Sequence, residues 1–435
     1  MRSIWKKDVT PPEYPILEGE RTCDVLIIGG GMAGVLCARR LQDAGFSCIL
    51  LEAGRLGGGT TANTTAKISA LEGGKWAQRL ERLGKERTAL YFAAKQQAKE
   101  DLIALCANTD CDPEAVDAYL YTSGEEGELE KELAALHTIG ARVDFCGEQA
   151  LPFAATGALR LAGEAQFHPL KFLYGITGGL EIFERSRVVD LSPTLAKTEN
   201  GATVRATHTV VATHFPFLNK HGGYFMKQYQ HRSYVLALEN APFPQGIWRD
   251  IAEDGLSFRH YGNYLLMGGG GHRTGKDGGG WALLRSLAEL YFPNAKEVAH
   301  WAAEDCITLD TMPYIGQYGK RTPELLVATG FEKWGMTGAM CAAAVIERIL
   351  LEKTDERTAL FSPQRKVYAP QLVCNLFSSA AGLLRPTAPR CPHLGCALRW
   401  NKQEHTWDCP CHGSRFDEDG TLLDGPANGD KHGLN

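Results

Sequence analysis

The fold is decided by the stretch Asp24-Val-Leu-Ile-Ile28-Gly29-Gly-Gly31-Met-Ala-Gly34, in which an apolar run leads into spaced glycines. The apolar run is typical of a strand inside a parallel sheet, and the residues from 35 to 44 indicate a helix behind it. Gly29 permits a tight turn, Gly31 lets the backbone approach a pyrophosphate, and Gly34 lets the helix pack on the strand. The stretch therefore predicts a helix N-terminus that faces the phosphates of a dinucleotide.

A second strand supports this prediction. Cys48–Leu51 is apolar and ends at Glu52, eighteen residues beyond Gly34, where a carboxylate can accept hydrogen bonds from a ribose. The segment 55–67 then supplies small and hydroxylated residues that suit a loop along an extended cofactor. No second GxGxxG follows a strand, so FAD is favoured over NAD(P)H; the alternative is a glycine-rich turn in an unrelated α/β protein. The expected cofactor-binding residues here are Gly29, Gly31, Met32, Ala33, Gly34, Glu52, Ala53, Thr60, Thr61, Thr64 and Lys67.

The other end of the chain contains two loops rich in cysteine and histidine. They are Cys391-Pro-His393-Leu-Gly-Cys396 and Cys409-Pro-Cys411-His412. A Rieske [2Fe–2S] centre holds one iron with two cysteines and the other with two histidines, and the two loops carry this signature. A tetrahedral zinc site is the alternative, because Zn²⁺ binds the same residue types. The expected iron ligands are Cys391, His393, Cys409 and His412.

Three further regions resemble the D-amino-acid oxidase and glycine oxidase superfamily of FAD enzymes, in the subset that bears a C-terminal Rieske domain. They are Gln166-Phe-His168 with Leu180–Val188, then Thr209–His214, then Asp310–Gly316 with Leu326–Gly338. The resemblance implies that Val188 contacts adenine through its backbone. It also implies that the helix Met336–Leu351 places its N-terminus under the flavin, where its dipole stabilises negative charge. The cofactor-binding residues added in this way are Val188, Thr213, Gly330, Lys333, Trp334, Gly335, Met336 and Thr337.

Two cysteines remain in the cluster loops after the ligands are assigned. In Rieske proteins of the respiratory type, cysteines at the positions of Cys396 and Cys411 form a disulfide that ties the loops together. The resemblance therefore implies this bond. Two buried thiols are the alternative, because a reducing compartment disfavours stable disulfides.

The expected fold class is α/β. An FAD-binding Rossmann-like domain with an interleaved α+β substrate domain is expected over 1–365, and a small all-β Rieske domain over 389–435. The FAD-binding parts are expected near 20–75, 165–215 and 305–355, and the substrate parts near 76–164 and 216–304. Residues 366–388 are expected to be a linker and a shortened Rieske base, because only twenty residues separate Pro370 from Cys391.

The middle of the chain gives coarser expectations. Segments 76–107 and 125–137 have helical spacing and are expected to form surface helices with solvated charges. Ser233–Leu238 and Tyr264–Met267 indicate strands of a substrate sheet. Gly268–Asp277 nearly matches a P-loop, but its last residue is a carboxylate where a magnesium-binding hydroxyl belongs, so a flexible turn is expected instead. The candidate catalytic residues are Lys333, His260 and Arg273.

Composition limits the classes of function and partner. A net charge of −5 with 22% charged residues provides no basic field for nucleic acid. No apolar stretch reaches the roughly 20 residues of a membrane span, and no export signal is visible, so we expect a cytoplasmic protein without a transmembrane segment. The other nine cysteines show no CxxC spacing and are expected to be buried apolar residues.

The resemblance implies an FAD-dependent oxidoreductase that oxidises a small amine or amino acid by hydride transfer to flavin. The electrons then pass singly to the Rieske cluster and to an external acceptor, a protein or a quinone. Two alternatives remain open at this stage. One is a reductase that carries electrons from a reduced partner through the cluster to flavin, and the other is a non-catalytic redox sensor.

Overall fold

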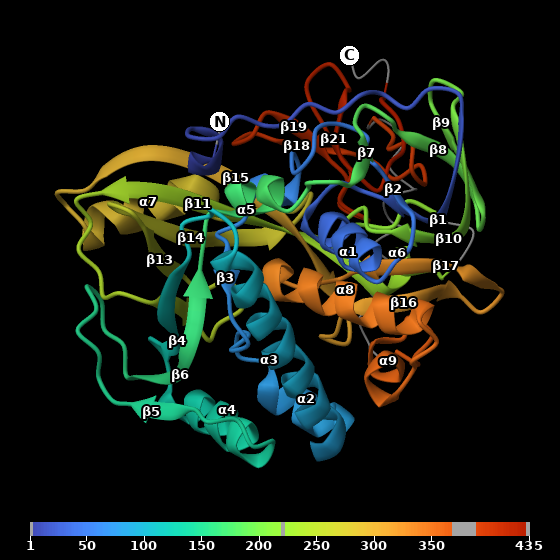
Figure 1. The fold of residues 1–435 in the computed structure, drawn as a ribbon. Helices are drawn as coiled ribbons and strands as arrows, with labels where there is room; N and C mark the ends of the chain where they lie inside the picture. Colours follow the sequence, from blue (N-terminus) through green and yellow to red (C-terminus); the bar gives the residue numbers. More distant parts are fainter. Residues whose placement is uncertain (1–2, 219–221, 368–388, 432–435) are drawn as a thin grey trace.

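The computed structural model describes residues 3–218, 222–367 and 389–431. Two large sheets form the body of the molecule, and a small sheet built by residues 389–431 lies against both (Figure 1). We call residues 389–431 the C-terminal unit. The expected α/β class and the small β-sheet at the C-terminal end are confirmed. The expected linker 366–388 lies almost entirely outside the described residues.

The first sheet places the predicted dinucleotide motif at the carboxyl ends of its central parallel strands. Its strand order is β16-β17-β10-β1-β2-β7, and β1 pairs in parallel with both β2 and β10. Ile28 lies opposite Leu51 on one side and Val211 on the other, so three strands end together. Their bounds are β1 Glu20–Ile28, β2 Cys48–Leu51, β7 Glu181–Phe183, β10 Thr203–Val211, β16 Tyr314–Gly319 and β17 Thr322–Thr329, with β8 Val188–Ser192 and β9 Leu195–Thr198 added beside β10.

Two helices pack together on this sheet, and a glycine lets the first of them approach β1 and the turn that follows it. They are α1 (Met32–Asp43) and α8 (Gly335–Leu350). A Cβ atom on Gly34 would come within 1.8 Å of the Gly29 carbonyl oxygen, so only glycine fits there. The role predicted for Gly34, close packing of helix on strand, is therefore the one observed.

The second sheet is mainly antiparallel, and one of its strands is longer than expected. The segment 268–273 was expected to be a flexible turn, but it continues β14, and His272 and Arg273 pair with β11. A Cβ on Gly268 would come within 2.7 Å of the Ser257 Oγ atom, so the glycine allows two strands to approach. The strands are β3 Lys67–Ile68, β4 Glu114–Thr122, β5 Asp144–Cys146, β6 Gly157–Gln166, β11 Gln228–Glu239, β12 Ile247–Asp250, β13 Ser257–Tyr261, β14 Tyr264–Arg273 and β15 Lys296–Thr308.

The helices expected in the middle of the chain are present, but their charges are not all solvated. Glu72 forms buried ion pairs with Arg79 and Lys95, both at 2.7 Å, and Lys99 pairs with Glu164 at 2.8 Å. The expectation of solvated faces was wrong for these side chains, because α2 and α3 pack their charged side chains against other parts of the domain. The α-helices outside the first sheet are α2 Trp76–Leu83, α3 Lys85–Ala107, α4 Glu126–Thr138, α5 Pro169–Gly175, α6 Tyr224–Lys227, α7 Gly280–Tyr291 and α9 Glu356–Phe361, and the short 3-10 helices are η1 Ile4–Lys6 and η2 Thr60–Asn63.

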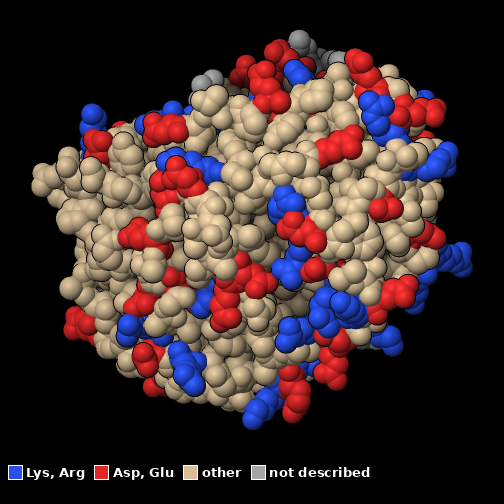
Figure 2. Space-filling model, viewed as in Figure 1, with Lys and Arg blue, Asp and Glu red and all other residues tan. Residues whose placement is uncertain are grey.

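The C-terminal unit is built on an antiparallel sheet of four short strands. They are β18 Arg399–Asn401, β19 Thr406–Asp408, β20 Arg415–Phe416 and β21 Leu422–Asp424. The two cysteine loops precede β18 and β20. In the described ranges, no helix is both long and apolar enough to cross a lipid bilayer. Acidic and basic side chains are interspersed over the face seen in Figure 2.

Candidate functional site

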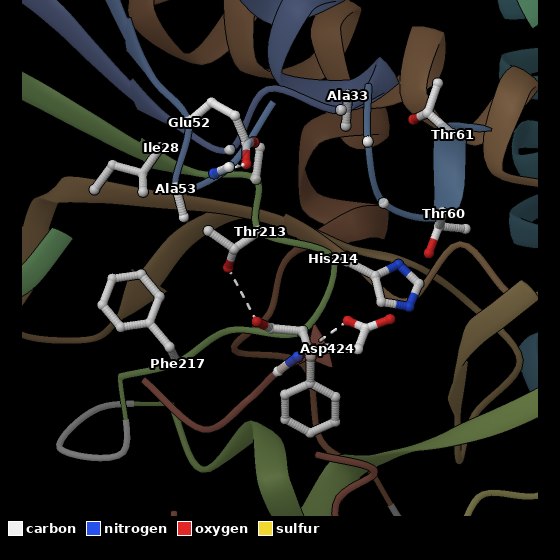
Figure 3. A pocket seen from close by; sticks show the side chains of 18 of the residues that line it. Ile28, Ala33, Glu52, Ala53, Thr60, Thr61, Thr213, His214, Phe217 and Asp424 are labelled. Carbon is white, nitrogen blue, oxygen red and sulfur yellow. Dashed lines mark hydrogen bonds between the residues drawn. The ribbon is translucent and has the colours of Figure 1, made fainter. Parts of the chain in front are cut away.

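A cavity of about 490 Å³ opens where β1, β2 and β10 end together. Figure 3 shows Glu52, Thr60 and Thr213 around it. Most of the residues predicted to bind a cofactor line this cavity. They are Gly29, Gly31, Met32, Ala33, Glu52, Ala53, Thr60, Thr61, Val188, Thr213, Gly335 and Met336.

Glu52 organises the glycine turn. Its two carboxylate oxygens accept hydrogen bonds from the backbone N–H groups of Gly30 and Gly54, both at 2.7 Å. Burial raises the pKa of Glu52, and the two N–H donors only partly oppose this effect. A Cβ on Gly29 would come within 2.6 Å of the Ala212 carbonyl oxygen, so the turn lies tight against β10. The carboxylate, the close backbone and the N-terminus of α1 form a cradle that fits a dinucleotide.

The other predicted cofactor residues do not line this cavity. Gly34, Thr64, Lys67, Gly330, Lys333, Trp334 and Thr337 are absent from its lining. The Thr337 hydroxyl donates to the Ser69 carbonyl at 3.0 Å and so fixes the start of α8. Lys333 and Trp334 instead line a smaller cavity of about 200 Å³, which shares Glu332 with the larger one.

Three cations are neighbours at the smaller cavity, which Arg249 and Lys333 line. They are Lys67, Arg249 and Lys333, and within the described residues none of them forms a salt bridge with a carboxylate. Arg249 donates to the Gly255 carbonyl at 2.6 Å, and Lys333 to the Glu253 carbonyl at 3.1 Å. Burial, together with the neighbouring Arg249, lowers the pKa of Lys333 to about 8, and burial lowers the pKa of Lys67 well below its usual value. Lys67 and Lys333 share one half-buried carboxylate neighbour, Asp305, which lines the larger cavity.

The remaining two catalytic candidates lie elsewhere. His260 is on β13 and lines neither of these two cavities. Arg273 donates to the Cys411 carbonyl at 3.2 Å, and its guanidinium lies 4.9 Å from the centre of the Tyr229 ring. Arg273 therefore contacts a cluster loop.

The two cluster loops come together as predicted. Each is a tight turn: the Gly395 N–H donates to the Cys391 carbonyl, and the Gly413 N–H donates to the Cys409 carbonyl, both at 2.9 Å. All four cysteines of the loops are buried, and the ring centres of His393 and His412 lie 5.0 Å apart.

The chemistry of these side chains suits an iron–sulfur centre. The His412 Nδ1 atom is buried and has no hydrogen-bond partner in the part of the chain that the structure describes. Burial lowers the pKa of His412 to about 4 and that of His393 to about 3, so both imidazoles are neutral and able to donate a lone pair to metal. Neutral imidazoles beside buried thiols are the donor set of a Rieske centre.

The sulfurs of the implied disulfide come close to each other. The Sγ atoms of Cys396, Cys409 and Cys411 all lie within 4.8 Å of one another. The loops thus bring the two sulfurs near each other, as expected, while the covalent bond remains a prediction.

One part of the site has no signal in the sequence. Residues 422–428 of the C-terminal unit line the larger cavity together with the glycine turn of the first sheet. Asp424 lies beside His214 there (Figure 3). These residues carry no motif, and only the docking of the C-terminal unit brings them to the cavity.

Comparison with known proteins agrees with this geometry. The family model for FAD dependent oxidoreductases matches residues 24–348, and the model for the Rieske [2Fe-2S] domain matches residues 354–432. A protein of Bacillus subtilis (strain 168), YhfW, described provisionally as a Rieske 2Fe-2S iron-sulfur protein, is 30% identical over 98% of this chain and 96% of its own length.

Solved structures share the fold of the larger part. Glycine oxidase from Geobacillus kaustophilus superposes with a TM-score of 0.66 at 20% identity, over 80% of this chain and all of its own. L-proline dehydrogenase from P. horikoshii superposes with a TM-score of 0.65 at 13% identity, over 80% of this chain and 98% of its own. The chain belongs to the FAD-dependent oxidoreductase family, with a Rieske domain at its C-terminal end, and its cofactors are FAD and a Rieske-type [2Fe–2S] cluster.

Proposed function

We propose that the protein is a dehydrogenase of a small amino acid that passes electrons singly to its Rieske cluster and then to an external acceptor, a protein or a quinone. When bound, FAD takes up the hydride from the C–H bond beside the substrate nitrogen, and the cluster takes up single electrons. A neutral amine that loses this hydride, two electrons and one proton, becomes an iminium ion, and water hydrolyses the iminium ion to a carbonyl product and the free amine. The chain itself binds the substrate, orients it and keeps the two redox groups close.

The observation that carries this proposal is a single side chain between the cavity and the cluster loop. Gln230 on β11 donates through Nε2 to the Gly425 carbonyl at 2.7 Å, and Gly425 lines the cavity. On its other side, Gln230 packs so closely on Gly413 that a Cβ there would lie 2.5 Å from the Gln230 Cβ. Gly413 directly follows His412. This short connection favours electron transfer between the two cofactors inside one chain.

The choice of an amino acid over a plain amine rests on the three cations. Lys67, Arg249 and Lys333 are charged neighbours without a carboxylate salt bridge among the residues described, and an anion would relieve their mutual repulsion. A substrate carboxylate supplies that anion and orients the C–H bond. The solved relatives named above act on amino acids, which agrees with this choice.

An anaerobic screen tests the proposal. The purified protein is mixed with amino acids and, for each one, with the amine that has the same side chain but lacks the carboxylate. We expect at least one amino acid to bleach the flavin absorbance and then to produce the electron-paramagnetic signal of a reduced Rieske cluster. The matched amine should react far more slowly. If the cluster is reduced only by a separate reduced donor and never by an amino acid, electrons run in the opposite direction and the proposal is wrong.

A cluster variant tests the order of electron flow. Cys391→Ala should leave flavin bleaching by the substrate intact when FAD is in excess, and should abolish onward reduction of the acceptor. Cys146→Ala, outside the C-terminal unit, is the matched control and should change neither step. Loss of flavin bleaching in the Cys391 variant would contradict the proposed order.

A further inference from the structure

We propose that the C-terminal unit is a structural part of the FAD-binding site, so that FAD binds tightly only while this unit is docked. The inference concerns FAD alone and is independent of the substrate proposed above. Seven consecutive residues of the unit, 422–428, line the same cavity as Gly29 and Glu52. They start in β21, whereas the glycine turn follows β1, so the two walls of the cavity come from opposite ends of the chain.

Specific hydrogen bonds hold this segment against both large sheets. The Asn428 side-chain amide donates to the Val188 carbonyl at 3.0 Å, and Val188 is itself a cavity residue. Gln230 donates to the Gly425 carbonyl at 2.7 Å. Two hydrogen bonds from separate parts of the larger domain, residues 3–367, therefore fix the two ends of the 425–428 segment.

The same segment is tied to the cluster loop. The backbone N–H of Ala427 donates to the Ser414 hydroxyl at 3.0 Å. The Ser414 carbonyl accepts in turn from the N–H of Cys409, one of the expected iron ligands, at 2.8 Å. The cavity wall and the cluster loop are thus parts of one hydrogen-bonded structure.

The unit packs closely against the rest of the chain. At three glycines, a Cβ atom would lie closer than 3.0 Å to the facing side chain or backbone. The pairs are Gly275 with Pro410 at 2.6 Å, Gly280 with Gln403 at 2.1 Å, and Gly413 with Gln230 at 2.5 Å. All three glycines have positive φ, so both the backbone and the available space require glycine.

A charged contact at the same interface is shielded from water. Arg232 on β11 pairs with Glu404, and the two side chains are only 8% and 7% exposed. Separation of the unit would leave Arg232 without its carboxylate partner until water solvates it, which is unfavourable. The wall formed by residues 422–428 is therefore a stable part of the cavity.

Hydrogen exchange of the unaltered protein tests the inference directly. FAD is added to the deflavinated full-length protein, and amide exchange is followed by mass spectrometry. We expect peptides that cover residues 422–428 to exchange roughly tenfold more slowly with FAD bound, as the glycine-turn peptides also should. Peptides of the remote helix α4 should not change. Unchanged exchange at 422–428, together with slowing at the glycine turn, would overturn the proposal.

Substitutions give a second, quantitative test. Asn428→Ala and Gln230→Ala each remove one hydrogen bond of about 1 kcal/mol, so the Kd for FAD should rise about fivefold in each. Asn108→Ala and Gln149→Ala are matched controls, because those amides bond only to nearby carbonyls of the same segment, and they should stay within about twofold of the unaltered protein. Iron and sulfide content verifies that the cluster is retained. An unchanged Kd in both test variants, with the cluster present, would overturn the proposal; if a variant loses its cluster, the exchange experiment decides.

Discussion

At the scale of single residues, His214 is held in a backbone conformation that suits glycine. Its φ is 64°, it lines the larger cavity, and its Nε2 atom is buried without a hydrogen-bond partner among the residues that the structure describes. A non-glycine residue in this region costs about 1 kcal/mol. No side-chain hydrogen bond therefore offsets the strain. We expect the imidazole to serve ligand binding in the cavity and not the stability of the fold.

His214→Gly should raise the free energy of unfolding of the deflavinated protein by about 1 kcal/mol, measured by urea denaturation. His405 provides a control with the same substitution, because its φ is 56° and it is exposed in the β18–β19 hairpin. His405→Gly should stabilise by a similar amount. If His214→Gly instead destabilises the protein, then the ring makes a stabilising contact in the folded state.

Lys333 gives the site a pH dependence. Its pKa of about 8 results from burial and from the neighbouring Arg249, while Asp305, Asp254 and Glu253 act in the opposite direction. The lysine is a cation below this pKa and becomes neutral as the pH rises through it. Binding of a carboxylate ligand should therefore weaken, by up to roughly tenfold, between about pH 7 and about pH 9.

The measurement is the ligand-induced change in the flavin spectrum across this pH range. Lys333→Arg is the matched variant, because its guanidinium stays protonated throughout, so its affinity for the same carboxylate should be flat. A flat profile for the unaltered protein would show that Lys333 does not contact the carboxylate.

At the scale of elements, the loop before α2 is joined to α2 and α3 by a buried ionic network. Glu72 is 3% exposed and pairs with Arg79 and Lys95 at 2.7 Å, and the Tyr91 hydroxyl donates to it at 2.9 Å. Burial alone would raise the pKa of Glu72, but Lys95 and Arg79 outweigh burial and lower it. The contribution of Glu72 to stability is therefore present at neutral pH and is lost as the pH falls below the ordinary carboxylate range.

Glu72→Gln should lower the free energy of unfolding by about 3–5 kcal/mol, because two buried cations lose their partner. The comparison is Asp43→Asn, which removes an exposed partner of Arg39 in α1 and should change stability by less than about 0.5 kcal/mol. Thermal or urea unfolding at neutral pH measures both. Equal effects for the two variants would mean that the buried network contributes no more than a surface pair.

Two strands and one cavity segment show which structural features follow from the sequence and which do not. The strand Cys48–Leu51 has the predicted bounds, because a strand buried on both faces is an uninterrupted apolar run. The strand Tyr264–Arg273 was predicted only as far as Met267, because a run of glycines resembles a turn until the neighbouring strand is known. The glycine turn and Glu52 follow from local spacing. Residues 422–428 do not, because only tertiary docking brings them to the cavity.

At the scale of the whole molecule, Glu404 holds the C-terminal unit to the larger domain. It pairs with Arg232 of β11 and with Arg415 of its own unit, and it accepts from the Tyr234 hydroxyl at 3.1 Å. Burial opposes its charge, but the two arginines outweigh burial and lower the pKa of Glu404 to about 2. The folded pKa lies below the ordinary value, so this contribution persists at neutral pH and is lost only as the pH falls from the ordinary carboxylate range toward about 2.

Glu404→Gln removes the carboxylate partner of buried Arg232, while Arg415 keeps its ion pair with Asp408, so the docking of the unit should weaken by about 3 kcal/mol. During heating of the unaltered protein, bleaching of the cluster, release of FAD and loss of helical signal should coincide, because docking couples them. In Glu404→Gln, bleaching of the cluster and release of FAD should move together to a lower temperature, while the helical signal persists. Glu418→Gln is the matched control, since Glu418 is exposed in the same unit and pairs only with exposed His405. A Glu404→Gln protein that keeps one coincident transition at the original temperature would show that this network does not hold the cavity closed.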